Sequence, residues 1–167
     1  MNCPLFRGRF YGVIMKFHRL SAAFYAHFSN CKEIPNKEFR PYYVLLLNLD
    51  NLTYAIPLRS HIAHRYCFIA DNSNGQNSGL DYSKAVVITD SAQYIDPAPV
   101  TIRQHEYNTL KQHEHLIQKR FSSYVILYKN EICRRIKNPK LPVSTLCQYS
   151  SLQYFHGELG LPIVAPA

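Results

Sequence analysis

The segment Arg59–Arg65 carries the densest set of chemically active side chains in the sequence. Between its two terminal arginines it holds a serine, Ser60, and two histidines, His61 and His64. Side chains of these types are often functional where a buried strand gives way to a loop. Arginine can bind a phosphate through two parallel hydrogen bonds, and histidine can exchange a proton near neutral pH. The segment therefore fits the cleavage of RNA by its own 2′-hydroxyl, which needs alignment, proton transfer and charge neutralisation but no metal.

The same cluster also has simpler interpretations. Basic and hydroxyl side chains are common on solvated surfaces and at caps after strands, so the cluster alone does not identify an enzyme. His61 and His64 are three residues apart, which would suit a metal on a helix, but no third ligand has a convincing spacing. We therefore expect no metal site and no cofactor. The sequence has no GxSxG, HExxH or Walker motif, so the common hydrolase classes that use them are not indicated.

The charge of the chain favours a polyanionic partner. Lysine and arginine number 19 against 11 aspartates and glutamates, which gives a formal net charge of +8. Such a surplus is typical of proteins that bind nucleic acid, although many basic proteins bind none. The densest basic stretch, residues 129–140, fits either the wall of an RNA groove or the cationic end of a helix. Thirteen tyrosines offer rings that can stack on unpaired bases, although most tyrosines of a small domain lie in the core or at its rim.

A strand-rich first half and a helix-rich second half must position these side chains. We expect strands at 16–20, 42–49, 52–56, 66–70, 84–88 and 93–95, and helices at 21–29, 103–136 and 144–156. Two apolar strands that flank Asp50-Asn51 predict a hairpin, and Pro57 is expected to end its second strand. The long helix is expected to break near Lys129-Asn130.

Length and pattern together predict one compact α+β domain. Its core would be a twisted, mostly antiparallel sheet flanked by helices. We expect residues 15–167 to form this domain and residues 1–14 to be an upstream extension. Five well-separated cysteines without a CxxC pair predict reduced thiols rather than a disulfide framework or a zinc site. No apolar run is long enough for a membrane span or a signal peptide, so a cytoplasmic protein is expected.

Several short motifs, in order along the chain, resemble the ToxN/AbiQ family of type III toxin–antitoxin systems. They are Met15-Lys16-Phe17, Phe24-Tyr25, Arg40-Pro41-Tyr42, Ala55-Ile56-Pro57-Leu58-Arg59-Ser60 and Gly79-Leu80-Asp81-Tyr82-Ser83-Lys84. The run from Ile56 to His64 is closest to the TenpN-like branch of that family. The order and spacing of the motifs, over roughly residues 15 to 160, are better evidence than any single motif.

The resemblance implies both an activity and a partner. Toxins of this family are metal-independent, sequence-selective endoribonucleases with a fold similar to the MazF/Kid toxins, and they leave 2′,3′-cyclic phosphate ends. They process the repeat transcript that encodes their own RNA antitoxin, which folds as a pseudoknot, binds the basic groove of the toxin and inhibits it. Free toxin cuts cellular or phage RNA and arrests growth, as in abortive infection. The expected partners are therefore an RNA antitoxin and substrate mRNA, in a hetero-oligomeric protein–RNA assembly without a membrane.

The resemblance carries over only in part to individual residues. A pair of small hydroxyl residues in the family matches only at Ser60, because Arg59 replaces the first member, and a lysine that follows the pair is absent. Our hypothesis assigns phosphate alignment to Ser60, proton transfer to His61 or His64, charge stabilisation to Arg59 and Lys84, and substrate contact to Tyr25. The residues expected to bind RNA are Arg40, Arg65, Lys129, Arg134, Arg135, Lys137 and Lys140. The alternatives are a non-catalytic RNA-binding module and a structural protein whose charge is incidental.

Overall fold

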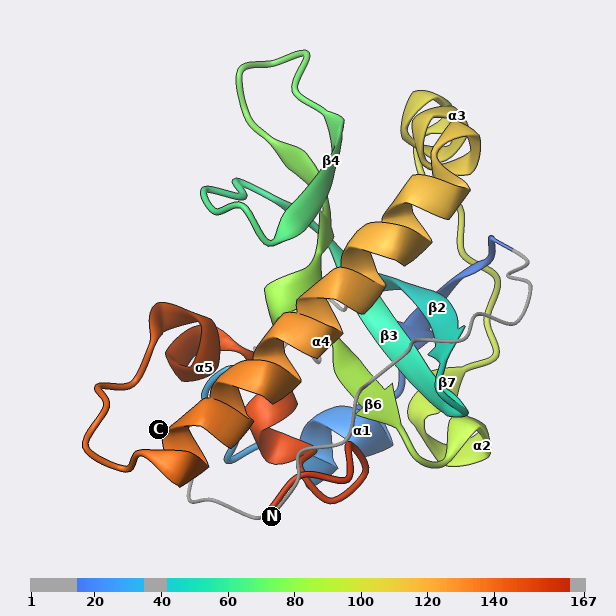
Figure 1. Cartoon of the computed structure of the whole chain (residues 1–167). Coiled ribbons are helices and arrows are strands. Elements are labelled where there is room, and N and C mark those ends of the chain that lie inside the picture. The colour runs from blue at the N-terminus through green and yellow to red at the C-terminus, as the bar shows by residue number, and fades with distance from the viewer. Residues whose placement is uncertain (1–14, 35–41, 163–167) are drawn as a thin grey trace.

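The computed structural model describes residues 15–34 and 42–162, and Figure 1 shows them as a twisted sheet with helices packed against it. The strands are β1 (Phe17–Leu20), β2 (Tyr43–Leu49), β3 (Leu52–Ser60), β4 (Cys67–Asp71), β5 (Ser78–Asp81), β6 (Val86–Ile88) and β7 (Ile95–Asp96). The helices are α1 (Ala22–His27), α2 (Ser91–Tyr94), α3 (Gln104–Gln112), α4 (Glu114–Lys137) and α5 (Thr145–Tyr149), with 3-10 helices η1 (Tyr82–Lys84) and η2 (Ser151–Tyr154). The predicted single-domain α+β fold is confirmed.

All pairings in the seven-stranded sheet are antiparallel, in the order β4-β5-β3-β2-β1-β7, with β6 paired to β3. The β2–β3 hairpin turns at Asp50 and Asn51, whose φ angles are 53° and 64°. Two consecutive left-handed residues are typical of a type I′ turn, which suits the twist of a hairpin. The predicted hairpin is confirmed.

One edge of β3 is shared by two short strands. β6 pairs with Thr53–Ala55 and β5 pairs with Leu58–Ser60, while η1 fills the chain between β5 and β6. The prediction that Pro57 ends the strand is wrong. Neither β5 nor β6 pairs with Pro57, so on this edge the missing N–H of proline breaks no ladder bond and β3 continues to Ser60.

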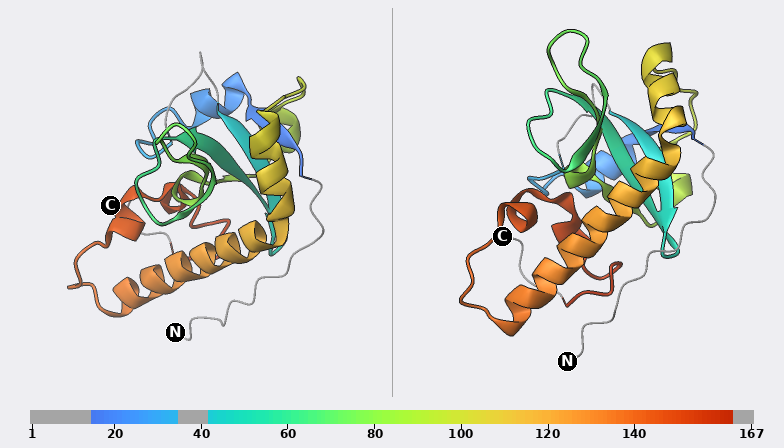
Figure 2. Two further views of the ribbon diagram at one scale, coloured as in Figure 1. Left: turned by 90° about the horizontal axis from the view of Figure 1, so that it is seen from above. Right: turned by 45° about the horizontal axis from the view of Figure 1, so that its top comes forward.

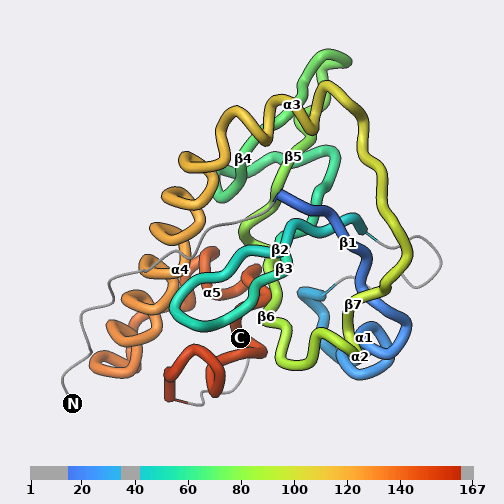
Figure 3. Tube along the Cα trace, turned by 90° about the vertical axis from the view of Figure 1, so that its right-hand side faces the viewer, coloured from blue at the N-terminus to red at the C-terminus, as the bar shows by residue number. Residues whose placement is uncertain are grey.

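The long amphipathic segment forms two helices rather than one. In the segment 103–136, apolar residues spaced three, four or seven apart form one stripe, as an amphipathic helix requires, and this stripe is buried. Phe121 on α4 packs against Tyr54 of β3 with ring centres 5.1 Å apart. The break lies at His113, whose backbone leaves the helical region, and not near Lys129-Asn130. Burial of the flanking apolar residues outweighs the low helix propensity of Asn130. Figures 2 and 3 show α4 across one face of the sheet, with α1 and α2 on the other side.

The cysteines do not all match the expectation of reduced thiols. Cys31, Cys67 and Cys147 are free, whereas Cys133 is disulfide-bonded. Among the helices of the described residues, none combines the length and the apolar character that crossing a membrane requires.

Candidate active site

A pocket of about 280 Å³ lies where the end of β3, η1 and α5 meet. Its walls come from three segments that are far apart in the sequence. The lining residues are Arg59, His64, Tyr66, Ser83, Lys84, Thr145, Leu146 and Tyr149. The structure therefore brings together Arg59, His64 and Lys84 from the hypothetical catalytic set, and it adds two tyrosine rings to them.

Asp81 is the centre of the polar contacts beneath the pocket, and its side chain is completely buried. Its Oδ2 accepts a hydrogen bond from Arg59 Nη1 at 2.5 Å. Its Oδ1 accepts hydrogen bonds from the hydroxyl of Ser83 at 2.6 Å and from the Ser83 backbone N–H at 3.0 Å. The same oxygen lies 3.3 Å from Nε2 of His64. A buried carboxylate requires such partners, and here it fixes an arginine, a histidine and a serine at once.

Arg59 is held in place but still reaches the pocket. Burial alone would lower its pKa, but the opposing charge and hydrogen bond of Asp81 outweigh burial, so the pKa of Arg59 lies above its usual value. The guanidinium carbon also lies 5.7 Å from the ring centre of Tyr42, a cation–π contact. About a quarter of the Arg59 side chain remains exposed. An arginine fixed in this way is preorganised to stabilise negative charge that develops on a phosphate.

His64 has the contacts of an oriented acid–base group. Its Nε2 lies between Oδ1 of Asp81 and the hydroxyl oxygen of Ser83, at 3.3 and 3.4 Å. Both oxygens can accept a hydrogen bond from Nε2–H, and in that tautomer Nδ1 keeps a lone pair. The side chain is 37% exposed and lines the pocket, so a substrate can reach the imidazole, and Nδ1 is the ring nitrogen left to accept a proton.

Lys84 lines the pocket, but Glu33 neutralises its positive charge. Its Nζ forms an ion pair with Glu33 and donates a hydrogen bond to the backbone carbonyl of Tyr149 at 2.9 Å. These contacts tie η1 to the segment after α1 and to α5. Lys84 therefore supplies less net positive charge to the pocket than an unpaired lysine would.

The C-terminal segment holds η1 against the sheet. Asp81 caps η1 by accepting from the Ser83 N–H. The hydroxyl of Ser151 donates to the carbonyl oxygens of Ser83 and Ala85, at 3.2 and 2.5 Å. Next to it, the hydroxyls of Ser150 and Tyr124 are 2.7 Å apart, so α4 is connected to the same turn. The position of Ser83 beside His64 thus depends on contacts from the far end of the chain.

The other three residues of the catalytic hypothesis lie outside the pocket. Ser60 and His61 are exposed at the end of β3, where His61 Nδ1 is 3.1 Å from the Ser60 hydroxyl. Tyr25 is only 4% exposed, so its burial does not favour the expected contact with substrate, which stays a prediction. Burial raises the pKa of Tyr25 to about 12, against a smaller lowering by the backbone N–H of Tyr42.

The end of α4 is less available to RNA than its sequence suggests. Lys129 is 5% exposed, so its burial does not favour the expected place in a groove wall. Burial lowers the pKa of Lys129, and the charge of Asp50 opposes that shift. Arg134 donates two hydrogen bonds of 2.9 Å to Glu131, which neutralise its charge. Arg135 is partly buried, and Lys137 and Lys140 are exposed. Arg40 lies outside the described residues.

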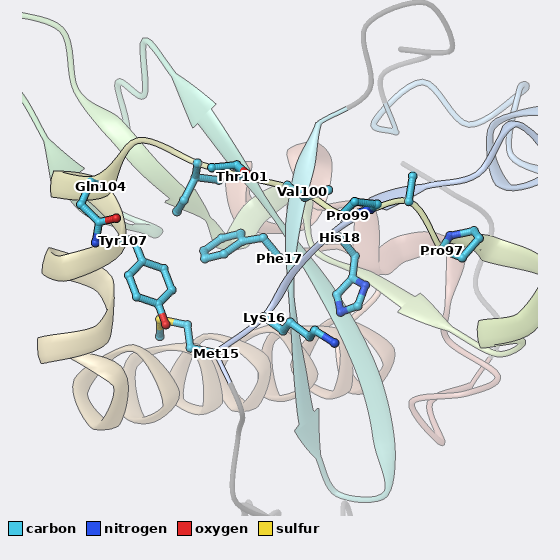
Figure 4. A pocket seen from close by; sticks show the side chains of 12 residues that line it. Met15, Lys16, Phe17, His18, Pro97, Pro99, Val100, Thr101, Gln104 and Tyr107 are labelled. Carbon is cyan, nitrogen blue, oxygen red and sulfur yellow. The ribbon is translucent and has the colours of Figure 1, made fainter.

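A larger cavity, of about 430 Å³, lies between β1, the segment after β7 and the start of α3. Figure 4 shows Lys16 just before β1 and His18 on β1, with Tyr107 from α3 and the proline-rich chain 97–102 around the same space. Burial, and then the charge of Lys16, lowers the pKa of His18. This cavity holds one lysine and no arginine, so it offers less to a phosphate than the pocket at η1. Within residues 15–34 and 42–162, no cluster of histidine, cysteine or carboxylate side chains could hold a metal ion.

Sequence reasoning missed four residues of the pocket region: Tyr66, Asp81, Ser83 and Tyr149. Asp81 is the last residue of β5 and caps η1, and it also pairs with Arg59. The only available signal was the Asp81-x-Ser83 spacing, which is typical of a side chain that caps a turn. Nothing local in the sequence indicated that Tyr66 and Tyr149 lie together.

Comparisons with protein-family models, with curated proteins and with solved structures find no match for this chain. The chemistry of the pocket therefore has to be inferred from the residues of the chain itself.

Proposed function

We propose that this protein is a metal-independent endoribonuclease and the toxin of a type III toxin–antitoxin pair. The observation that carries the proposal is the pocket in which Arg59, His64 and Ser83 are arranged around the buried Asp81. An arginine aimed at a phosphate and a histidine oriented by a carboxylate are what cleavage by the RNA 2′-hydroxyl requires.

In this mechanism the 2′-oxygen of the RNA attacks the adjacent phosphorus. Nδ1 of His64 takes the proton of the 2′-hydroxyl, while Nε2 stays hydrogen-bonded toward Asp81 and Ser83. Arg59 stabilises the negative charge on the phosphorane. The P–O5′ bond then breaks, the 5′-oxygen leaves with a proton from the solvent, and a 2′,3′-cyclic phosphate remains on the other fragment.

The two tyrosines of the pocket fit a single-stranded substrate. Tyr149 is 53% exposed, Tyr66 is partly buried, and both line the pocket. Aromatic rings bind splayed bases by stacking, at about 1–3 kcal/mol per base. Unpaired RNA, with bases free to leave the helix, is therefore the substrate class that the pocket favours.

The toxin assignment rests on the resemblance to the ToxN/AbiQ family. In that proposal, a pseudoknot RNA cut from a repeat transcript covers the pocket and inhibits the enzyme in a protein–RNA assembly. The free protein would cut cellular or phage RNA in the cytoplasm. The MazF/Kid-like character of the fold belongs to the same proposal.

The experiment compares two histidines of one segment. Purified wild type, His64→Gln and His61→Gln are incubated with end-labelled single-stranded RNA in EDTA, and the fragments are tested for 2′,3′-cyclic phosphate. His64→Gln should lower the cleavage rate about 10²- to 10⁴-fold, since that is the usual contribution of general acid–base catalysis. His61→Gln makes the same change outside the pocket, and its loss should be the smaller of the two.

Each other outcome has a definite meaning. A greater loss in His61→Gln would move the proton transfer to His61 and contradict the assigned pocket. RNA that is retained but not cut by the wild type would favour the non-catalytic RNA-binding module. Cleavage that EDTA abolishes would contradict metal independence.

A further inference from the structure

A second hollow, of about 470 Å³, shares Tyr66 with the candidate active site. We call it the α4 hollow, because half of its wall is one side of that helix. It is lined by Arg65, Tyr66, Cys67, Tyr82, Leu116, Lys119, Arg120, Ser123, Tyr124 and Leu127. Since the two hollows have a wall in common, a chain-like ligand in the first can continue into the second.

The α4 hollow is positively charged without compensation. Arg65, Lys119 and Arg120 are all exposed, and none of the lining residues is acidic. Among the described residues, Lys119 and Arg120 have no carboxylate within ion-pair distance. Lys84, in the neighbouring pocket, differs because Glu33 neutralises it. Three unmatched cations around one hollow favour a polyanion.

The floor of the α4 hollow is aromatic and apolar. The rings of Tyr66 and Tyr124 are 5.5 Å apart, and those of Tyr82 and Tyr124 are 6.2 Å apart. Leu127 is 44% exposed at its rim, one of the few large apolar side chains that the described structure leaves open. A ligand with alternating charged and flat apolar parts, such as a nucleotide, matches this combination.

Tyr66 is fixed between the two hollows. The guanidinium of Arg65 lies over its ring at 5.1 Å and donates a hydrogen bond of 3.0 Å to its hydroxyl. On the other side, its ring centre is 6.4 Å from that of His64. A rigid ring in this place can separate two successive bases of one strand.

We propose that the α4 hollow is a subsite for the nucleotide adjacent to the one that is cleaved, with Lys119 and Arg120 on its phosphate. This inference rests on the proposed function, since it assumes that single-stranded RNA occupies the pocket beside it. The proposal places RNA binding on the first half of α4. The sequence analysis had instead predicted RNA binding by the basic stretch at residues 129–140.

The test measures RNA binding rather than cleavage. The probe is a fluorescein-labelled 12-nucleotide RNA of mixed sequence with 2′-O-methyl riboses, which cannot be cut by this mechanism. The fluorescence anisotropy of the probe is measured as protein is added, at several salt concentrations. The proteins compared are the wild type and the double variant Lys119→Gln/Arg120→Gln. The control is Lys137→Gln/Lys140→Gln, which removes the same number of positive charges outside the hollow. The first double variant should weaken binding about tenfold and flatten the salt slope by roughly 0.7, the value expected for the loss of one phosphate contact on a single strand.

A second pair of variants adds a negative charge instead of removing positive charges. Leu127→Glu places a carboxylate at the rim of the hollow, and Val143→Glu places one at another exposed apolar position, 40% exposed, that does not line it. Leu127→Glu should weaken binding of the same probe several-fold more than Val143→Glu. Both positions are on the surface, so folding should be preserved, which circular dichroism checks.

Equal losses in the members of each matched pair would mean that only overall charge matters, and would overturn the subsite. Failure of the wild type to bind the probe would overturn it as well. If the wild type cleaves no RNA but the α4 hollow variants lose binding selectively, the α4 hollow stands as a nucleotide-binding site of a non-catalytic RNA-binding module, and the endoribonuclease proposal fails. The two proposals are therefore distinguishable.

Discussion

The molecule has two basic regions, and they differ in what surrounds their cations. Around the pocket and the α4 hollow, Arg59 is held by a buried carboxylate while Lys119 and Arg120 face a hollow without acidic side chains. At the end of α4, Lys129 is buried and Arg134 is paired with Glu131. Lys137 and Lys140 are exposed there, but they line neither the pocket nor the α4 hollow. The stretch that is denser in basic residues therefore contributes no cation to either of the two hollows.

This difference shows that a count of cations does not measure binding capacity. A lysine or arginine contributes to binding when it adjoins a cavity and when no carboxylate has already neutralised it. In the pocket, pairing with a carboxylate also has a second effect. The side chain of Asp81 is completely buried, and it orients both Arg59 and His64. The following predictions test these two uses of pairing.

The largest effect should come from removing the carboxylate at the centre of the pocket region. Asp81→Asn leaves Arg59 without its buried partner, which typically costs about 3–5 kcal/mol of stability. Asp96→Asn breaks another aspartate–arginine pair, with Arg19, in which both side chains are 32% exposed; such a pair contributes only about 0–1 kcal/mol. Urea denaturation of both variants measures the difference, and equal stabilities would contradict the structural role of Asp81.

His156, which follows η2 and contacts α4, should affect stability rather than cleavage. Nε2 of His156 lies 2.8 Å from the hydroxyl of Tyr128, and burial lowers the pKa of His156, against a smaller rise from the carbonyl of Pro162. The folded protein therefore disfavours the protonated form. Stability is complete above the unfolded pKa of about 6.5 and falls as pH drops below it, by no more than about 1.4 kcal/mol per pH unit.

Urea denaturation at several pH values between 7.5 and 5.5 tests the role of His156. The wild type should lose stability over this range, and His156→Gln should lose less, because glutamine binds no proton. The same pH dependence in both proteins would show that other groups cause it. His64→Gln gives the contrast, since it should change cleavage and leave this stability difference in place.

The smallest effects on RNA binding should come from removing the carboxylate that pairs with one basic side chain, at the pocket or at the end of α4. Glu33→Gln releases Lys84 at the pocket, and Glu131→Gln releases Arg134 at the end of α4. The first variant should bind the 12-nucleotide probe a few-fold more tightly, with a salt slope steeper by roughly 0.7. The second should change binding less, because Arg134 lines none of the hollows described above. Equal gains would mean that the two regions are equivalent for RNA.

Short sequence patterns predicted those helices and turns that depend on residues close together in the chain. Asp50-Asn51 between apolar strands specified the hairpin, because both residues accept left-handed backbone angles. Ser21 and Ser144 cap helices as expected, since a hydroxyl can accept from a backbone N–H three residues ahead. The apolar spacing of α4 predicted its buried side, but the actual break at His113 had no comparable signal.

The sequence by itself determined the α+β elements, the excess of positive charge and the presence of two histidines near Arg59. Only the tertiary structure distinguishes those histidines, which are three residues apart and chemically identical. Asp81 and Ser83, about 20 positions further along the chain, fold against His64, whereas His61 contacts its neighbour Ser60, and this difference is why the proposal assigns proton transfer to His64. The reason is that a charge can be buried only where its partners assemble, and those partners come together through contacts that no local pattern specifies.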